Sequence, residues 1–454
     1  MTGIVCFARR CDKHWRSRTW RAIIPAPPVL PMSAMKPVKR LQDLRASLGP
    51  GLLLAAAAIG VSHLIQATRA GADYGLGLLW AVLLVNLFKY PFLEYGPRYA
   101  AATGRSMLDG YWALSRYALG IYFVFTVGTM FAIQAALALV TANLAIAMTG
   151  LPGSPLVWAA GLLGLSAAIL FRGRYDILDG AVKWIVAVLA TCTLVAVVAA
   201  GVHGPAGDWS SAPATAWWSA GGIAFVIALM GWMPIPIDAA AWHSLWTLER
   251  ARQTGHVPSL SHARLDFNIG YIGTCILAVG FLLLGALVMY ATDTPFSDNG
   301  AAFAEQLIGL YTQTLGAWAW PVIAGCAFTA MFSTLLTVLD AHPRVMRHMI
   351  GQFAGRPTLQ THIGLYRGLL LVIPACSLLV LYGLGSRFTV MIDLATTLSF
   401  LTAPILAWLN YRLVTSAQVP ANARPGPAMR WLSRAGLVFL SAFALIYAGW
   451  RLLG

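Results

Sequence analysis

The sequence predicts an all-α integral membrane protein with about eleven transmembrane helices. Three observations support this fold class. First, 59% of the 454 residues are hydrophobic and only 10% are charged, whereas soluble domains carry about 25% charged residues. Second, the apolar segments are each about 20 residues long, which is the length that crosses a bilayer. Third, two of these segments, the first and the sixth, are interrupted near their middles.

Eleven apolar segments account for most of the chain. We predict membrane spans at about 49–75, 75–99, 119–148, 155–171, 178–200, 219–246, 265–290, 315–339, 364–381, 388–409 and 431–452. Helices one to five (about 47–201), six to ten (about 219–410) and eleven (about 431–452) form one transmembrane domain, residues 36–454. Residues 1–35 are basic and too rich in proline for a signal-peptide core. We expect a disordered cytoplasmic tail there, or an extension upstream of a true start at Met32 or Met35.

Basic residues alternate from one side of the predicted spans to the other. They precede span one and follow spans two, four, six, eight and ten, as Lys36, Lys39, Arg40, Arg45, Arg98, Arg105, Arg116, Arg172, Arg174, Arg250, Arg252, Arg264, Arg344, Arg347, Arg356, Arg412, Arg424, Arg430 and Arg434. The other connections carry acids, with Arg69 and Arg387 as exceptions. The positive-inside rule then predicts a plasma (inner) membrane protein with a cytoplasmic N-terminus and an external C-terminus. The net charge of +15 is thus an orientation signal that favours anionic lipids, and nucleic-acid binding is not needed to explain it.

Enzyme motifs are missing from the sequence. It contains no HExxH zinc motif, no GxSxG elbow and no paired intramembrane aspartates of a protease. The six cysteines are scattered without a metal or redox spacing. We therefore expect neither an enzyme nor a resident cofactor.

The two interrupted spans indicate function. In the first, the run Gly60-Val61-Ser62-His63 places small and polar residues at mid-depth, which is costly unless the backbone opens onto a polar cavity. Packing of small residues against a neighbouring helix is the alternative. In the sixth, Pro234 and Pro236 remove helix hydrogen bonds. Corresponding breaks in two halves of a chain predict a binding site between inverted repeats of a secondary transporter.

At these positions the chain resembles the Nramp family of divalent-metal transporters. From Gly49 to Ser106 it carries GPG, the four-residue break, AGADYG, LLW, NL and AATGRS in the family's order, and Met233-Pro234 resembles the family's Met-Pro-His. The resemblance covers about residues 36–452. It implies the LeuT-like fold of the amino-acid transporter superfamily, a 5+5 inverted repeat with helices one and six broken. It also implies proton-coupled transport of Mn²⁺ or Fe²⁺ by alternating access.

The departures from the family fall on the metal site. The family's metal-binding Asp and Asn correspond to Gly60 and His63, its His after Met-Pro to Ile235, and a glutamate on its proton route to Gln134. The implied metal ligands that remain are His63 and Met233, which suit transition metals better than Mg²⁺ or Ca²⁺. The full set of predicted substrate-binding residues is Gly60, Val61, Ser62, His63, Gln134, Met233 and Pro234.

The two soft ligands and the nearest carboxylate each have a structural alternative. His63 either ligates the metal or hydrogen-bonds an opened carbonyl. Met233 either ligates or packs. Asp238 completes the site or carries the coupling proton, or else it caps the half-helix that follows.

Charged side chains in other spans are also candidates for the cavity. Lys89 either pairs with Glu94 or stands as a fixed positive charge near the cavity, because a lysine facing lipid at mid-depth costs about 3 kcal/mol or more. Asp393, Thr396 and Thr397 either face the cavity or pack between helices. Loss of the family Asp and the presence of Lys89 favour an alternative function, the same fold carrying a small organic acid, amino acid or amine. The expected partners are the transported ion or solute and membrane lipids.

Overall fold

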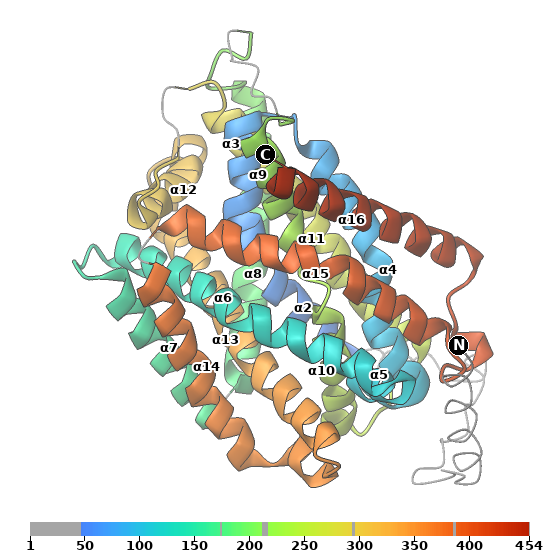
Figure 1. The fold of residues 1–454 in the computed structure, drawn as a ribbon. Helices are drawn as coiled ribbons and strands as arrows, with labels where there is room; N and C mark the ends of the chain where they lie inside the picture. The colour runs from blue at the N-terminus through green and yellow to red at the C-terminus, as the bar shows by residue number, and fades with distance from the viewer. Residues whose placement is uncertain (1–46, 173–174, 211–216, 293–295, 385–386, 454) are drawn as a thin grey trace, which may run out of the picture. The chain divides into compact units, whose positions relative to one another are not determined.

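The computed structural model describes residues 47–172, 175–210, 217–292, 296–384 and 387–453, and all regular secondary structure in this part of the chain is helical (Figure 1). The predicted tail at residues 1–35, with Met32 and Met35, lies outside the described residues. The elements are α2 (Pro50–Ala58), the π-helix η2 (Ser62–Ala67), α3 (Thr68–Tyr74), α4 (Leu79–Thr103), α5 (Met107–Leu114), α6 (Arg116–Thr149), α7 (Pro155–Phe171), α8 (Tyr175–His203), α9 (Ala220–Trp232), α10 (Ala239–Thr254), α11 (Leu260–Met289), α12 (Gly300–Leu315), α13 (Ala319–Phe353), the 3₁₀ turn η3 (Pro357–Thr361), α14 (Ile363–Leu384), α15 (Phe388–Thr415), the 3₁₀ turn η4 (Ala421–Ala423) and α16 (Pro427–Leu453).

The predicted order of spans is confirmed. In the described part of the chain, six helices are long and apolar enough to cross a membrane: α6, α11, α13, α14, α15 and α16. The bent pair formed by α2 and the segment Ser62–Tyr74 makes a seventh. The remaining predicted spans correspond to α4, α7, α8 and the pair α9–α10. The chain is therefore a multi-pass membrane protein whose first and sixth spans are broken.

Two helices, α13 and α12, differ from the prediction. α13 continues to Phe353, well past the predicted end at residue 339, because its polar C-terminal part still packs against η3 and α5. Residues 300–315, expected as a connection, form α12 with Phe303, Leu307 and Tyr311 on its buried side. A short amphipathic helix has too few apolar residues to resemble a membrane span in the sequence.

The first break bends its span by 46°. α2 ends at Ala58, and the wider π-helix begins at Ser62. Gly60 lies between them with its Cα against Thr334, so that an added Cβ would stand 3.1 Å from that side chain. The N-terminus of α2 is held by Asp266 of α11, which accepts hydrogen bonds from the backbone N–H groups of Gly49 (2.9 Å) and Gly51 (2.6 Å).

The second break is longer and irregular. α9 ends at Trp232 and α10 begins at Ala239, so that Pro234 and Pro236 both lie in the connection. Gly231, one residue before the end of α9, lies directly against the backbone carbonyl of Thr396 in α15, and a Cβ there would overlap it. α9 and α15 can approach this closely because glycine has no side chain.

The broken spans lie inside the bundle, and the unbroken ones surround them. α11 packs along α2, η2 and α3, while α15 packs along α9. Figure 1 shows α7 and α14 side by side at one margin, where both contact α6. At the opposite margin α16 lies on α4 and α15 (Figure 1). This packing brings the two breaks together between α6 and α13.

Candidate functional site

The two breaks meet at Ser62 and Pro234. The Ser62 hydroxyl lies 3.2 Å from the carbonyl oxygen of Pro234 and 3.0 Å from that of Ala58. A cavity of about 30 Å³, here called the break cavity, lies beside this contact. Its lining is mostly apolar and comprises Ala57, Ala58, Val61, Ser62, Ile133, Leu137, Trp232, Pro234, Ile235, Pro236, Trp242, Thr334 and Val338.

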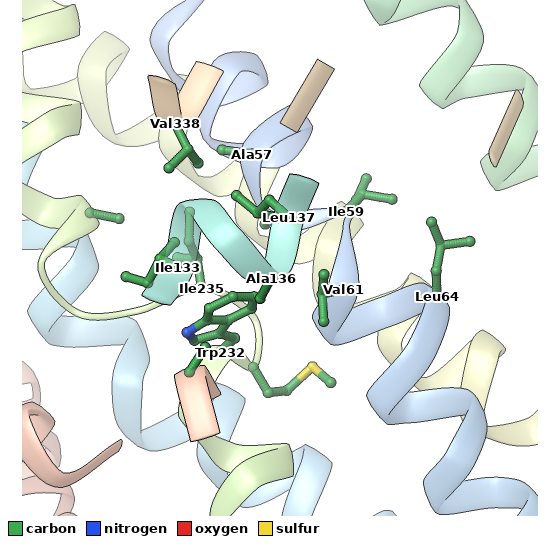
Figure 2. Packing of buried hydrophobic residues seen from close by; sticks show 14 of the residues in the cluster. Ala57, Ile59, Val61, Leu64, Ile133, Ala136, Leu137, Trp232, Ile235 and Val338 are labelled. Atoms are coloured by element: carbon green, nitrogen blue, oxygen red, sulfur yellow. The ribbon is translucent and has the colours of Figure 1, made fainter. Parts of the chain in front are cut away.

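Figure 2 shows how the lining is assembled from distant segments. Val61 comes from the first break, Trp232 and Ile235 from the second, and Ile133 and Leu137 from α6 between them. The indole N–H of Trp232 donates to the Ser399 hydroxyl (2.8 Å), which fixes the ring against the cavity. Of the predicted substrate-binding residues, Val61, Ser62 and Pro234 thus line the break cavity.

His63 is fully buried but does not line the break cavity. Its Nε2 lies 3.0 Å from the carbonyl oxygen of Thr274 in α11, and its Nδ1 lies 2.8 Å from the Ser62 hydroxyl. A carbonyl can only accept, so Nε2 carries a hydrogen, and the lone pair of the neutral ring is on Nδ1, facing Ser62. The structural alternative, a histidine bonded to a carbonyl, is what this conformation contains; ligation by His63 stays a prediction.

The remaining predicted ligands surround the cavity without lining it. Met233 is fully buried in the hydrophobic core. Gly60 contacts Thr334 rather than the cavity. Gln134 points to α13, where its Nε2 donates weakly to the carbonyl oxygen of Leu335 (3.4 Å), and its Oε1 has no partner among the described residues.

Lys89 reaches the backbone of the second break. Its fully buried ammonium donates to the carbonyl oxygens of Met230 (2.7 Å) and Gly231 (2.8 Å), and it lies 3.5 Å from that of Ile235. In a continuous helix the Met230 carbonyl would accept from the N–H of residue 234, but proline has none. Lys89 supplies the donor that Pro234 removes. The Lys89 side chain therefore lies at the second break, and its role as a fixed positive charge stays a prediction.

Glu94 does not pair with Lys89, so the predicted pair between these two side chains was wrong. Both its carboxylate oxygens accept from Arg98 (2.7 and 2.8 Å), and Arg264 of α11 adds a contact at 3.3 Å. Arg98 is one helical turn away, a better spacing for a pair than the five residues that separate Glu94 from Lys89. Glu94 does not line the break cavity.

Asp238 occupies the N-cap position of α10, as the capping interpretation predicted, but its side chain makes no capping hydrogen bond. It is buried, and its Oδ1 has no partner among the described residues. Tyr122 of α6 donates instead to the Asp238 backbone carbonyl (3.1 Å). The carboxylate is thus close to the second break but outside the break cavity.

Asp393 and Thr396 of α15, which the sequence offered as candidates for the cavity, lie on the other side of the first break from the break cavity. Asp393 accepts from Arg69 (2.9 Å) and Gln66 (3.0 Å), and Arg69 also lies over the ring of Phe225. The Thr396 hydroxyl bonds to a carbonyl of its own helix, that of Ile392 (2.8 Å). None of these side chains lines the break cavity.

A larger cavity, here called the basic cavity, was not anticipated from the sequence. It measures about 260 Å³ and, like the break cavity, is lined by α2, α10 and α13. Its charged and titratable lining consists of Arg105, Asp109, Glu249, Arg250, Arg252, Asp340, Arg344, Arg347 and His348. In the sequence these arginines indicate only the orientation in the membrane, because nothing in their spacing shows that they share a cavity.

A hydrogen bond at the wall of the basic cavity joins α5 to α13. Asp109 accepts from His348 (2.8 Å), and the N–H of Ser106 lies 3.1 Å from the same carboxylate. Burial alone would raise the pKa of Asp109, but the hydrogen bonds and the attraction of His348 outweigh it and lower the pKa from 3.8 to about 2. The carboxylate is therefore ionised at neutral pH.

No preformed chelating cluster is present among the described residues. In that part of the chain, no group of three or more His, Cys, Asp or Glu side chains is close enough to hold a metal ion. Cys192, Cys275, Cys326 and Cys376 are free thiols in the helices. Opened carbonyls and single side chains are what the breaks offer to a ligand.

Two sequence comparisons identify relatives of this chain. Residues 51–448 match the family described as natural resistance-associated macrophage protein-like. An uncharacterised protein of Pasteurella multocida (strain Pm70) is 34% identical over 420 residues, which cover 89% of this chain and 93% of that protein.

Solved structures share the fold at low sequence identity. A manganese transporter of Eremococcus coleocola, crystallised as a mutant, aligns with a TM-score of 0.67 and 14% identity over 91% of this chain and 88% of its own. The protein MhsT in complex with L-phenylalanine aligns with a TM-score of 0.56 and 15% identity over 87% and 98%. A nucleobase-cation-symport-1 family transporter in a closed conformation aligns with a TM-score of 0.54 and 14% identity over 89% and 92%. The LeuT-like arrangement with two broken helices is therefore the fold of this chain.

Proposed function

Because the chain belongs to the natural resistance-associated macrophage protein-like (Nramp) family, we propose that it carries divalent transition-metal ions, Mn²⁺ or Fe²⁺, across a membrane by alternating access. The observation that carries this proposal is the cavity of about 30 Å³ where Ser62 of one break meets Pro234 of the other. A single water needs about 10–15 Å³, whereas pockets for drug-sized ligands measure about 300–1,000 Å³. In this conformation the cavity has the size of an ion or a water.

The breaks supply both the ligands and the hinges. Carbonyls around Pro234 offer oxygen atoms, and His63 and Met233 offer softer ligands suited to transition metals. The Gly60 carbonyl is occupied in this conformation, because it accepts from the backbone N–H groups of His63 (3.1 Å) and Leu64 (2.9 Å). Since neither side chain lines the break cavity in this conformation, metal binding requires the His63 ring to leave Ser62. The half-helices on either side of the two breaks then move to open one face and close the other. Asp238, whose Oδ1 has no partner in the described part of the chain, is the proposed proton carrier.

The membrane and its sides follow from the distribution of Lys and Arg. We place the protein in the plasma (inner) membrane with its N-terminus in the cytoplasm and its C-terminus outside. The basic cavity, lined by arginines that follow spans two, six and eight, then opens towards the cytoplasm. The pair of Arg69 with Asp393 lies on the external side of the first break.

Uptake of Mn²⁺ into liposomes that contain the purified full-length protein tests the proposal. We expect saturable uptake that an inward proton gradient accelerates, and a loss of at least about tenfold in His63→Ala, the scale on which metal sites respond to altered ligation. His243→Ala is the matched control, because His243 is equally buried but lines neither cavity. Absence of both Mn²⁺ binding and Mn²⁺ uptake by the wild type would contradict the proposal.

One observation favours a second candidate, transport of a small organic acid, amino acid or amine. The carbonyls of Met230 and Gly231, which would suit a cation, are already occupied by the Lys89 ammonium. A fixed positive charge at the break repels a dication and attracts a carboxylate. Thermal stabilisation of the purified protein by amino acids, carboxylates and amines, measured beside Mn²⁺, separates the two candidates. Stabilisation by an organic solute and not by Mn²⁺ supports the second.

A further inference from the structure

We propose that the basic cavity binds an anion that carries a phosphate group, either a small phosphate ester or the headgroup of a phospholipid. This site goes beyond the proposed function, because its lining shares no residue with the break cavity and does not depend on which substrate the breaks accept. Binding is noncovalent and needs no co-reactant.

The lining of the basic cavity carries an excess of positive charge. Five arginines and three carboxylates line it. The arginines come from three separate parts of the chain: Arg105 precedes α5, Arg250 and Arg252 belong to α10, and Arg344 and Arg347 belong to α13. Because α5, α10 and α13 also pack on one another, the fold gathers like charges that repel. An anion placed between them would offset that repulsion.

Two of the three carboxylates are occupied by partners in the cavity wall. The Oδ1 of Asp340 accepts from the Tyr366 hydroxyl, and its Oδ2 accepts from Arg344 (2.6 Å). The Oδ1 of Asp109 accepts from His348 (2.8 Å), and its Oδ2 accepts hydrogen bonds at the N-terminus of α5. These acids serve the wall, so they are poor ligands for a cation in the space that they enclose.

Two of the arginines have no carboxylate partner. In the described part of the chain, Arg105 and Arg347 make no ion pair. The guanidinium of Arg347 lies over the ring of Tyr366, 5.3 Å from its centroid, which holds the group in place without neutralising it. Arg105 is exposed. A guanidinium has five N–H donors and keeps its charge at any physiological pH, so both side chains offer donors to a ligand.

The arrangement of these donors favours a phosphate over a carboxylate. A phosphate ester carries about −1.5 to −2 charges at pH 7, which matches the excess of two arginines over carboxylates in the lining. Its three oxygen atoms can accept from donors on several sides, as α5, α10 and α13 present them. A planar carboxylate, by contrast, presents two oxygens that match one guanidinium fork.

The size of the cavity leaves room for more than the phosphate group. Its volume of about 260 Å³ is just below the range of about 300–1,000 Å³ that is usual for pockets of drug-sized ligands. Leu53, Leu245, Trp246 and Leu248 give the lining an apolar part. The cavity therefore suits a phosphate group that is joined to a small organic group.

The first experiment measures binding of phenyl phosphate to the purified full-length protein in detergent, by isothermal titration calorimetry at constant ionic strength. Benzoate is the reference ligand, because it joins the same ring to a carboxylate. The variants are Arg105→Gln and Arg347→Gln. Arg434→Gln is the matched control, because Arg434 is an exposed arginine that lines neither cavity. Since Arg105 is also exposed, Arg105→Gln keeps the test decisive if Arg347→Gln is unstable.

A second experiment distinguishes the two sources of the phosphate group. Thermal unfolding midpoints of the wild type, Arg105→Gln and Arg434→Gln are measured in phosphatidylcholine liposomes, with and without phosphatidic acid. A midpoint that phosphatidic acid raises in the wild type and Arg434→Gln, but not in Arg105→Gln, assigns the phosphate to a lipid headgroup. Saturable binding of phenyl phosphate in detergent assigns it to a soluble ester.

We expect the wild type to bind one of these two phosphates. Each cavity variant should weaken binding about tenfold or more, the scale of one charge-assisted hydrogen bond, whereas Arg434→Gln should change it less than about twofold. Benzoate should bind at least about tenfold more weakly than phenyl phosphate.

Three results would overturn the inference: no binding of either phosphate, equal binding of benzoate, or an equal loss in Arg434→Gln and the cavity variants. None of these measurements uses Mn²⁺. Their failure therefore leaves the proposed function intact, and a protein that binds phosphate but neither binds nor carries Mn²⁺ would contradict the proposed function alone.

Discussion

The two breaks satisfy their opened backbones in different ways. The first remains helical in a wider turn, and the single hydrogen of its own Ser62 hydroxyl has two acceptors within reach, the Ala58 carbonyl one turn earlier (3.0 Å) and the Nδ1 of His63 (2.8 Å). The second is extended around two prolines, and its carbonyls are satisfied by Lys89 from α4. The first break thus supplies its own donor, whereas the second depends on a cation from another helix.

This difference indicates which break is the more easily rearranged. A hydroxyl can turn to another acceptor at little cost, so the first break can change its bonds without moving a neighbouring helix. A buried ammonium that leaves its carbonyls must find other partners, since an unpaired charge in the interior is very costly. The second break is therefore pinned to α4 until another cation or water replaces Lys89. The predictions below test this contrast.

The largest expected effect is that of Lys89→Met. This change leaves the carbonyls of Met230 and Gly231 without their donor, at about 1–3 kcal/mol for each buried unpaired group. We expect the free energy of unfolding to fall by about 2–5 kcal/mol, measured by thermal and denaturant unfolding in detergent.

Leu87→Met is the control for that substitution, because Leu87 is on the same helix and 50% exposed. It should be neutral. Equal stability of the Lys89 and Leu87 variants would mean that the second break does not depend on the lysine, and the contrast between the breaks would disappear.

The second prediction compares one glycine from each break. A Cβ at Gly231 would overlap the backbone carbonyl of Thr396, whereas a Cβ at Gly60 would meet the Thr334 side chain at 3.1 Å. A side chain can turn away and a backbone carbonyl cannot. We expect Gly231→Ala to cost about 3 kcal/mol or more and Gly60→Ala about 1 kcal/mol, measured as the difference in unfolding midpoints. The reverse order would show that the first break is the rigid one.

The sequence contains the breaks but not their partners. Gly60, Pro234 and Pro236 interrupt apolar segments, so their effect on a helix could be predicted locally. The acceptors of Lys89 lie 141 and 142 residues further along the chain, and no periodicity carries that information. Of the two interpretations of Lys89, the pair with Glu94 was wrong, because Glu94 binds Arg98 one turn along its own helix while Lys89 reaches the second break.

The candidate site was predictable to the same extent. Ser62 and Pro234 meet as the paired breaks implied, because the inverted-repeat fold brings corresponding segments together. The orientation of side chains within that meeting point was not predictable. His63 turns to α11 and away from the cavity, where its Nε2 lies 3.0 Å from the carbonyl oxygen of Thr274.

The third prediction concerns pH. It tests whether the dependence of the second break on Lys89 extends to a part of the molecule outside the two breaks. The folded-state pKa of Asp109 is lowered from 3.8 to about 2, so the ionised carboxylate stabilises the folded state above about pH 4. This stabilisation is lost as the pH falls from about 4 towards 2, and at one pKa unit per about 1.4 kcal/mol it amounts to about 2 kcal/mol.

Asp109→Asn should therefore be less stable than the wild type at pH 7, and the difference should vanish near pH 2. Thermal unfolding across this range, performed in both the wild-type and the Lys89→Met backgrounds, measures it. Because Asp109 joins α5 to α13 and touches neither break, its effect should be the same in the two backgrounds. An effect that depends on Lys89 would show that the second break is coupled to the basic cavity.

The smallest expected effect compares two serines, one at each break. Ser62→Ala removes a hydroxyl that serves the first break, and Ser399→Ala removes the acceptor of the Trp232 indole N–H at the end of α9. Each should cost about 1 kcal/mol of unfolding free energy. Only the Ser62 change frees the lone pair of His63 Nδ1, so it should tighten Mn²⁺ binding about two- to fivefold if His63 is a ligand, since one lost competing hydrogen bond is worth about 0.5–1 kcal/mol. Calorimetric titration of both variants with Mn²⁺ measures this change in Kd. An unchanged Kd in Ser62→Ala would remove His63 from the set of ligands. The carbonyls of the second break, and the Lys89 that occupies them, would then determine which substrate the site accepts.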